Sequence, residues 1–395
     1  MRDVYIVDAV RTPIGKYGGA LSSVRPDDLL ATVIKGLVSR NKNINTADIE
    51  DVIAGAANQA GEDNRNVARM AALLAGLPVN VAGTTVNRLC ASGMQSIMDG
   101  ARQIMCGDAE LIIACGVESM SRAPFVLSKT TQPFQRTAEM VDTTLGWRFI
   151  NDKLAGLHYP YSMGETGENV ARQWNISREA QDEFALGSQE KYFSALEKEA
   201  WSTEILPVDT GGKIVSVDEH PRKTSLEKLA ALKPAFTKEG TVTAGNAAGI
   251  NDGAAAMLLA SEIIVKKYGL KPLGKVISMA VAGVDPSIMG MGPVPASQKA
   301  LKRASLSIAN MDIVELNEAF ASQALACIHD LGVDKNKVNV NGGAIALGHP
   351  LGCSGVRIGT TLVYEMKRRG SKYGLATMCV GVGQGASIIV ENCYT

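Results

Sequence analysis

Short apolar runs alternate with amphipathic stretches along most of the chain. The segment after Ser177 is a helix candidate, because this serine can cap a helix and the apolar residues that follow recur on one face. Other apolar runs have the length of buried strands, and they occur at residues 4–10, 52–56, 111–115, 276–281, 313–316 and 375–380. Strands that alternate with helices predict an α/β fold.

An internal repeat relates the first and last parts of the chain. Residues 47–54 resemble residues 311–318, and in both regions a Ser-Gly pair opens a helical pattern that ends before a small apolar strand. The spacing between matching positions is nearly constant, although short apolar strings can also match by chance. We therefore expect two similar α/β halves around an inserted loop domain. The expected bounds are 1–119 with 249–272 for the first half, 120–248 for the insert and 273–395 for the second half.

A glycine-rich segment at residues 341–355 carries His349, one of four histidines. Glycine permits tight turns and close approach of a ligand, and imidazole titrates near neutral pH. His349 is therefore a candidate general base, or a hydrogen-bond donor to a carbonyl oxygen, rather than a structural histidine. The remaining histidines lack such surroundings and are expected to be surface or packing residues: His158, His220 and His329.

Two cysteines lie in comparable turns. Cys90 stands just before a helical pattern that opens at Ser92, where the positive end of the helix dipole favours the reactive thiolate. Cys379 begins a Gly-x-Gly-x-Gly segment that has too few residues after it for a dinucleotide-binding fold. Its glycines are expected to direct backbone N–H groups at a developing oxyanion. Two thiols and one imidazole on such turns indicate acyl-transfer chemistry, which needs no metal or organic cofactor.

The composition argues against nucleic acid, a membrane surface and zinc as binding partners. Lysine plus arginine number 40, as do aspartate plus glutamate, so no overall field attracts nucleic acid or a membrane surface. Seven cysteines without a Cys-x-x-Cys pair fit neither a disulfide framework nor a zinc ribbon. The sequence has no signal-type apolar segment and no run long enough to cross a bilayer. A reducing cytoplasm is the expected location.

These motifs resemble those of the thiolase family over essentially the whole chain. The resemblance implies a duplicated α/β fold with five alternating layers (α-β-α-β-α), an inserted loop domain and usually a homotetramer. It also implies reversible cleavage of a 3-oxoacyl-CoA by CoA, giving acetyl-CoA and a shortened acyl-CoA, with CoA as a substrate and no cofactor. The matching segments, in the family order, are residues 87–93, 241–247, 317–320, 341–355 and 379–385.

The resemblance also assigns roles to single residues. Cys90 would carry the acyl group, His349 would activate it, and Cys379 would exchange a proton with the second substrate or the leaving CoA. Asn317, with a water, and His349 would form one oxyanion hole, although an asparagine after a strand can also simply form a turn. The N–H groups of Cys90 and Gly381 would form the other. The residues that would contact CoA are Arg222, near the nucleotide, and Met163, Ala244, Ala248 and Phe320, along the pantetheine.

Three positions depart from the biosynthetic acetoacetyl-CoA thiolases of this family. Ser162 replaces a histidine, Ala248 replaces a serine and Val382 replaces a glycine. Arg148 is a candidate contact for a distal carboxylate of the substrate, with a solvated loop arginine as the alternative. The segments that instead resemble β-ketoadipyl-CoA thiolases include residues 58–66, 118–125 and 142–149.

Other activities compete with this interpretation. An acetyl-CoA C-acetyltransferase that forms acetoacetyl-CoA shares the same motifs, so the substrate's chain length stays open. A β-ketoacyl synthase typically uses two histidines, or a histidine and an asparagine, in the second half of the chain, whereas here Cys379 occupies the last catalytic turn. A non-catalytic acyl-CoA-binding protein should have lost Cys90, His349 or Cys379, and a cysteine hydrolase gives no reason for a second thiol. The sequence therefore favours a thiolase.

Overall fold

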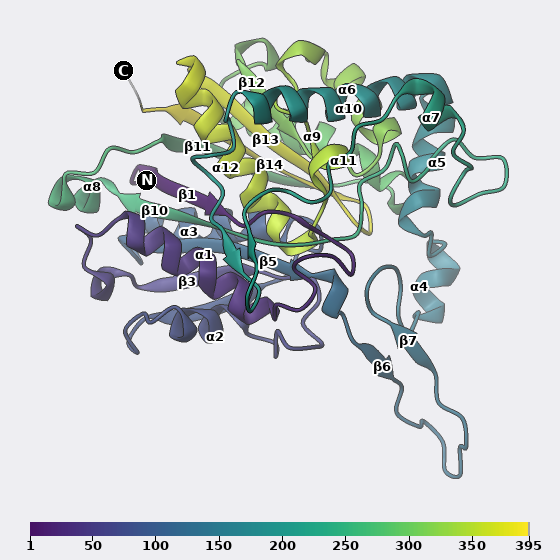
Figure 1. Ribbon diagram of the computed structural model, residues 1–395, viewed down its shortest axis with the longest axis horizontal. Coiled ribbons are helices and arrows are strands. Elements are labelled where there is room, and N and C mark those ends of the chain that lie inside the picture. Colours follow the sequence, from purple (N-terminus) through teal and green to yellow (C-terminus); the bar gives the residue numbers. More distant parts are fainter. Residues whose placement is uncertain (394–395) are drawn as a thin grey trace.

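Most strands of the protein join along one continuous path, shown in Figure 1. The structure is a computed structural model and describes residues 1–393. The strand order is β12-β13-β14-β11-β1-β10-β5-β3-β4, with β2 (Gly15–Lys16) paired to β10. The bounds along this path are β1 (Val4–Arg11), β3 (Asp51–Gly55), β4 (Ala82–Val86), β5 (Leu111–Ser119), β10 (Asn251–Ser261), β11 (Gly274–Gly283), β12 (Ile313–Leu316), β13 (Tyr373–Val380) and β14 (Gln384–Asn392).

The path consists of two half-sheets with the same internal order. In the first, β3 and β5 are parallel and β10 and β1 follow antiparallel; in the second, β12 and β13 are parallel and β14 and β11 follow antiparallel. The register slips between Ile6 and Asp8 in β1 and at the matching place, between Val276 and Ser278, in β11. Within residues 1–393, the two half-sheets are joined by strand pairing only where two residues of β1 pair with β11. This shared order shows the duplicated fold.

Helices cover both half-sheets and separate them. Helices α3 (Ser92–Cys106) and α12 (Leu351–Arg369) lie between the half-sheets and contact strands of both. Helices α1 (Pro26–Arg40) and α2 (Val67–Leu74) cover the outer face of the first half, and α9 (Pro293–Ala304) and α10 (Ala321–Leu331) cover that of the second. The five-layer arrangement expected from the sequence is confirmed.

Helices α3 and α12 touch backbone to backbone at their N-terminal ends. A Cβ atom on Gly93 would lie 2.5 Å from the carbonyl oxygen of Gly352, and a Cβ atom on Gly355 would lie 2.0 Å from the nitrogen of Met94. Only glycine permits an approach this close. Because Cys90 and His349 directly precede these two helices, the glycine contact brings distant parts of the sequence together.

The residues between β5 and β10 are those that the sequence predicts as an insert, and this division stays a prediction. The helix expected after Ser177 is α6 (Arg178–Glu197), and the serine hydroxyl accepts a hydrogen bond from the Ala180 N–H. Strands β6 (Phe125–Leu127) and β7 (Met140–Asp142) form a two-stranded arm that projects from the rest of the protein in Figure 1. The exact bounds of the three regions stay predictions.

The remaining elements are short, apart from α5 of the insert. No helix within residues 1–393 has the length and apolar character needed to span a bilayer. The other bounds are α4 (Asp152–Leu157), α5 (Met163–Gln173), α7 (Leu226–Ala230), α8 (Glu262–Tyr268), α11 (Ala344–Leu347), β8 (Val208–Asp209), β9 (Ile214–Val215) and the 3-10 helices η1 (Thr46–Asp48), η2 (Met120–Arg122), η3 (Pro286–Met291), η4 (Ile308–Asn310) and η5 (Lys335–Lys337).

Candidate active site

Cys90 lies in the turn between β4 and α3 and is partly buried. The preceding residue, Leu89, has a φ of 46°, a left-handed conformation that L-residues seldom adopt and that recurs at functional sites. Burial raises the pKa of the Cys90 thiol, whereas the N–H groups of Gly381 and of Cys90 itself lower it. The direction is opposite to the one expected from the helix terminus, because loss of solvent raises the pKa of Cys90 more than these N–H groups lower it. The resting thiol keeps its proton and needs a base.

Cys379 is buried at the end of β13, where the turn to β14 begins. Burial and, next, the charge of Cys90 raise its pKa well above the ordinary value, so Cys379 holds its proton firmly. The turn continues through Gly381 and Val382, and Val382 has a φ of 61°. The N–H of Gly381 faces the Cys90 sulfur. The structure thus brings the two sequence-predicted thiols into one electrostatic neighbourhood.

His349 is buried, and both its ring and its backbone are held by hydrogen bonds. Its Nδ1 lies 2.6 Å from Ser354 Oγ, and its backbone N–H donates to Asn251 Oδ1 at 3.0 Å. Burial, with a smaller contribution from the Arg357 guanidinium, lowers the pKa of His349 to about 3. The imidazole is consequently neutral at physiological pH and can accept a proton.

Asn317 follows β12 directly and reaches the His349 ring. Its Nδ2 lies 3.5 Å from each ring nitrogen of His349, and its backbone N–H donates to the Thr377 carbonyl at 3.0 Å. The Asn317 Oδ1 is buried and accepts no hydrogen bond from the described residues. The spare Oδ1 acceptor can hold a water, whereas the Nδ2 donors of the same amide are the groups that could polarise a carbonyl oxygen.

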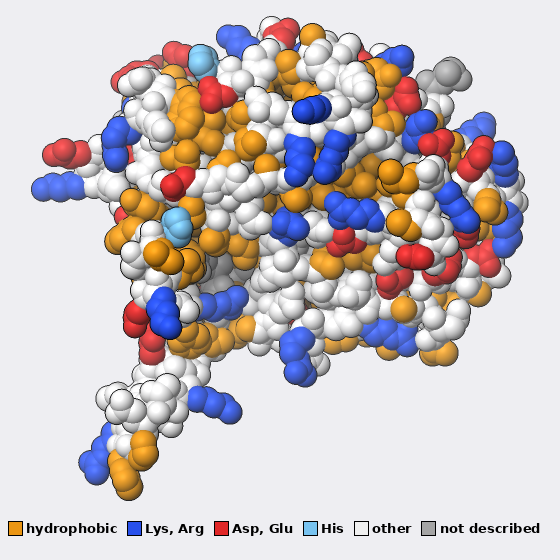
Figure 2. Space-filling model, turned by 180° about the vertical axis from the view of Figure 1, so that it is seen from behind, with side chains coloured by type: hydrophobic (Ala, Val, Ile, Leu, Met, Phe, Trp, Pro, Cys, Tyr) orange, Lys and Arg blue, Asp and Glu red, His pale blue; other side chains and the backbone are white. Residues whose placement is uncertain are grey.

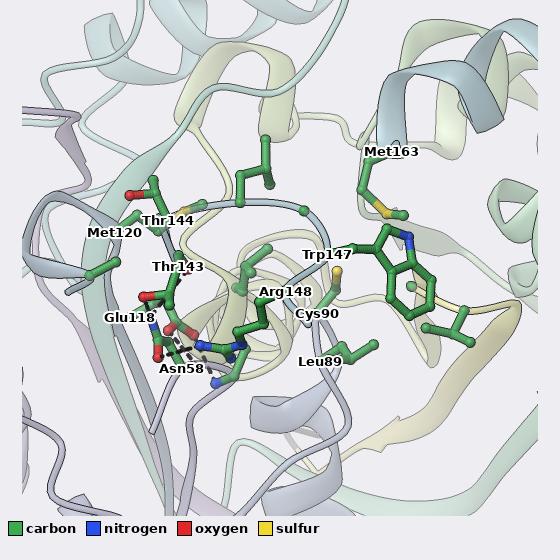
Figure 3. Close-up of a pocket in the computed structure, with 17 residues that line it drawn as sticks. Asn58, Leu89, Cys90, Glu118, Met120, Thr143, Thr144, Trp147, Arg148 and Met163 are labelled. Carbon is green, nitrogen blue, oxygen red and sulfur yellow. Dashed lines mark hydrogen bonds between the residues drawn. The ribbon is translucent and has the colours of Figure 1, made fainter. Parts of the chain in front are cut away.

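A cavity of about 260 Å³ opens in front of Cys90, as Figure 3 shows. One side is apolar, with Met163 and Trp147 near the thiol. Polar groups gather on another side, where Asn58 and Arg148 lie. The full lining is Ala57, Asn58, Leu89, Cys90, Glu118, Met120, Ala123, Thr143, Thr144, Leu145, Gly146, Trp147, Arg148, Met163, Leu351, Gly381 and Val382.

Arg148 enters this cavity from the inserted domain. Its Nη1 donates to Asn58 Oδ1 at 3.4 Å, and no carboxylate within residues 1–393 lies within ion-pair distance of its guanidinium. Asn58 is itself held, because its Nδ2 donates to Thr143 Oγ1 at 2.9 Å. The nearby Glu118 carboxylate accepts backbone N–H bonds, including one from Gly352, and burial raises its pKa to about 7. Arg148 therefore offers unused donors to a ligand.

The residues expected to contact CoA form two groups. Arg222 Nη2 donates to the Ala244 carbonyl at 2.6 Å, and both residues are exposed. Met163 and Phe320 pack in one apolar cluster with Cys379, next to the reactive thiols. The backbone N–H of Ala248 donates to the Ala319 carbonyl at 3.0 Å, which places Ala248 beside Phe320.

Ser162 and Val382 differ from the residues found in the biosynthetic thiolases. Ser162 has a structural role here, whereas Val382 introduces backbone strain. Ser162 caps α5: its hydroxyl accepts from the Glu165 N–H while the Glu165 carboxylate accepts from the Ser162 N–H. Val382 adopts a left-handed φ where glycine would be unstrained. Its side chain is 38% exposed and lines the cavity, so the strain places an isopropyl group against the ligand space.

Four residues near the site carry contacts that the sequence did not assign to them. Ser354 lies in the glycine-rich segment, five residues after His349. This closeness in sequence could have indicated a contact between the two side chains. Asn58 and Glu118 lie in segments that resemble the β-ketoadipyl-CoA thiolases, without a local sign of their contacts. Asn251 gives no sequence signal, because it reaches His349 from β10. No group of His, Cys, Asp and Glu in the described residues has the arrangement of a metal site.

Comparison with known proteins agrees with this geometry. Residues 4–263 match the thiolase N-terminal domain and residues 270–392 match the thiolase C-terminal domain. The β-ketoadipyl-CoA thiolase of Acinetobacter baylyi is 54% identical over 400 residues, which cover 99% of this chain and 100% of the relative. A 3-oxoadipyl-CoA/3-oxo-5,6-dehydrosuberyl-CoA thiolase of Escherichia coli strain K12 is also 54% identical, with the same coverage.

Solved structures lead to the same family. The acetyl-CoA acetyltransferase of Bacillus anthracis has a TM-score of 0.93 at 44% identity and covers 99% of both chains. Human mitochondrial 3-ketoacyl-CoA thiolase in complex with CoA has a TM-score of 0.93 at 42% identity, covering 100% of this chain and 98% of that chain. This chain therefore belongs to the thiolase family and is a CoA-dependent acyltransferase.

Proposed function

We propose that this thiolase cleaves 3-oxoadipyl-CoA, so that the acyl group carried by Cys90 is a succinyl group ending in a carboxylate. The observation that carries the proposal is Arg148, a cation that lines the same cavity as Cys90 and has no carboxylate partner among the described residues. A guanidinium binds a carboxylate through paired N–H donors. The substrates named for the similar bacterial thiolases support the same choice.

The first half-reaction transfers the acyl group to the enzyme. The Cys90 sulfur attacks the keto carbon while His349 Nε2 takes the thiol proton. The bond between the α and β carbons then breaks, its electron pair forms the acetyl-CoA enolate, and Cys379 gives that enolate a proton. The raised pKa of Cys379 suits this role, because the Cys379 thiol stays protonated until a strongly basic carbon is present.

The second half-reaction returns the acyl group to CoA. The Cys379 thiolate takes the proton of the incoming CoA thiol, and the CoA sulfur attacks the thioester on Cys90. As the Cys90 sulfur leaves, the His349 imidazolium returns its proton. The oxyanions would be stabilised by Asn317 and His349 in one position and by the N–H groups of Cys90 and Gly381 in the other. After both half-reactions, His349 and Cys379 have regained their starting protonation states. The scheme needs no resident cofactor, because CoA takes part as a substrate.

Substitution of Arg148 by glutamine tests the substrate. A lost hydrogen bond to a charged group is worth about 1.5–3 kcal/mol, so kcat/KM for 3-oxoadipyl-CoA should fall about 10- to 100-fold. Acetoacetyl-CoA has no distal carboxylate, and its kcat/KM should change less than about threefold. Arg136→Gln, in the exposed part of the insert, is the matched control. An equal loss on both substrates would refute the carboxylate role of Arg148.

CoA is expected to bind along Met163, Phe320, Ala248 and Ala244, with Arg222 near its nucleotide. In support of this path, the Arg222–Ala244 contact lies at the surface and Phe320 lies beside Cys379. The measurement is KM for CoA in Arg222→Gln at low and high salt. An exposed phosphate contact predicts a higher KM at low salt and a smaller difference at high salt.

We also propose a homotetramer in the cytoplasm. The arm formed by β6 and β7 exposes large apolar side chains, including Phe134 at 98% exposure, and Figure 2 shows apolar side chains at its tip. A monomer rarely keeps such a surface open to water, so contact with other copies is its natural use. Light scattering after chromatography would report the mass, and Phe134→Asp with Leu127→Asp should lower it. All seven cysteines are free, which suits a reducing compartment.

A further inference from the structure

We infer that Ser354 is a positioning residue that fixes His349 in the tautomer with its proton on Nδ1. This inference rests on the proposed role of His349 as the base for Cys90. The ring nitrogen that faces away from Ser354, Nε2, is then left with a free electron pair. Ser354 does not touch the substrate in this scheme, and it acts only through the imidazole.

The hydrogen bonds of the Ser354 hydroxyl determine the direction of its bond to His349. Ser354 Oγ lies 2.8 Å from the Pro350 carbonyl oxygen, which can only accept. A hydroxyl has one proton, so that proton goes to Pro350 and the oxygen has only electron pairs left for other partners. His349 Nδ1 lies 2.6 Å from the same oxygen. Nδ1 must therefore be the donor.

Burial of both residues strengthens the assignment of Nδ1 as the donor. Ser354 is fully buried and His349 is 6% exposed, so solvent offers few replacement partners to either group. A neutral imidazole has one donor and one acceptor nitrogen. The lowered pKa of His349 keeps the ring in that neutral form. With Nδ1 as the donor, Nε2 is the acceptor, which is the atom that a general base requires.

A second contact fixes the backbone that carries the ring. The His349 backbone N–H donates to Asn251 Oδ1, and the Asn251 Nδ2 donates to the Gly15 carbonyl at 2.9 Å. Gly348, just before His349, has a φ of 104°, and a Cβ atom there would lie 2.5 Å from the Asn251 side chain. Asn251 comes from β10 of the first half and Ser354 from α12 of the second. The backbone of His349 is thus held from the first half and its ring from the second.

The tautomer decides whether Cys90 can be activated. If Nε2 carried the proton, His349 would present an N–H to the Cys90 thiol and could not take its proton. With the proton on Nδ1, Nε2 accepts the thiol proton and the resulting Nε2–H can donate to the oxyanion that forms. One serine hydroxyl therefore supports both proposed functions of the same ring.

Replacement of Ser354 by alanine tests the rate. Loss of a residue that orients an imidazole costs about 10- to 100-fold, so kcat should fall by that factor while KM for CoA stays within about threefold. Ser354→Thr keeps the hydroxyl and should recover most of the rate. Thr360→Val is the control, because Thr360 lies on the same helix, is buried and donates to the Val356 carbonyl at 2.9 Å. The control should keep its activity.

The tautomer itself is measured by nitrogen NMR on protein labelled in its four histidines, with His349→Gln used to assign the signal. The inference expects a protonated Nδ1 and an unprotonated Nε2 in the wild type, and loss of that strict preference in Ser354→Ala. A protonated Nε2 in the wild type overturns it, as does full activity of Ser354→Ala beside an inactive His349→Gln. If His349→Gln keeps its activity, the proposed base role fails instead.

Discussion

Gly352 in the first turn of α12 should not tolerate a methyl group. A Cβ atom there would lie 2.4 Å from the Val117 carbonyl oxygen and 2.6 Å from the Gly55 carbonyl oxygen. Both oxygens belong to the backbone of the first half-sheet, so neither can rotate away as a side chain does. The Gly352 N–H also donates to Glu118 at 2.8 Å, which ties the start of α12 to the same half-sheet.

The expected displacement follows from these distances. An ordinary contact for a Cβ atom is 3.4 Å or more, so Gly352→Ala must move the start of α12 by about 1 Å. His349 directly precedes this helix, and Cys90 belongs to the half that resists the movement. A shift of about 1 Å between reacting groups costs about 100-fold in rate, and overpacking costs about 1–3 kcal/mol of stability.

Thiolysis kinetics and urea unfolding together check this reasoning. Gly359→Ala is the matched control, because Gly359 lies on the same helix and its Cβ atom would meet the end of the Met257 side chain at 3.2 Å. That control should keep its activity and gain up to about 1 kcal/mol from helix propensity. A Gly352→Ala variant with the wild-type rate and stability, or a Gly359→Ala variant that is impaired as severely, would exclude the backbone clash as the cause.

Two further predictions concern buried charges. With its pKa at about 3, folded His349 stays neutral while the unfolded chain protonates near pH 6.5, so its contribution is complete above pH 6.5 and is lost as pH falls toward 3. In urea, the stability of wild type relative to His349→Gln should fall by about 2 kcal/mol from pH 7.5 to pH 5, and a constant difference would contradict this. Arg11→Met leaves Glu204 and Asp218 buried without their cation and should cost about 3–5 kcal/mol in the same assay; a loss below 1 kcal/mol would exclude the role of this ion pair.

Local sequence patterns predicted six strands of the continuous path but missed β4, β10 and β14 on it. The six predicted runs lie in β1, β3, β5, β11, β12 and β13, and the helix after Ser177 is α6. Strand β10 is rich in alanine and leucine, which favour helices, and it is buried on both faces, so it shows no alternation. Strand β4 contains two threonines and lies at the edge of the path. Pairing with neighbours, rather than local preference, makes β10 a strand, whereas the threonines of β4 favour a strand but its partly exposed residues form no apolar run.

The sequence by itself determined the kinds of reactive group, the glycine-rich turns that hold them and the family. Each of those signals is a short stretch of consecutive residues, so it can be identified without knowledge of the folded structure. Only the tertiary structure placed Cys90 and Cys379 beside one another and raised the pKa of Cys90 where the helix terminus alone predicted a lower one. It also left Arg148 without a carboxylate partner among residues 1–393. Desolvation depends on how completely the folded protein excludes water, and the hydrogen bonds that matter here join segments that are distant in the sequence. No local sequence pattern contains that information.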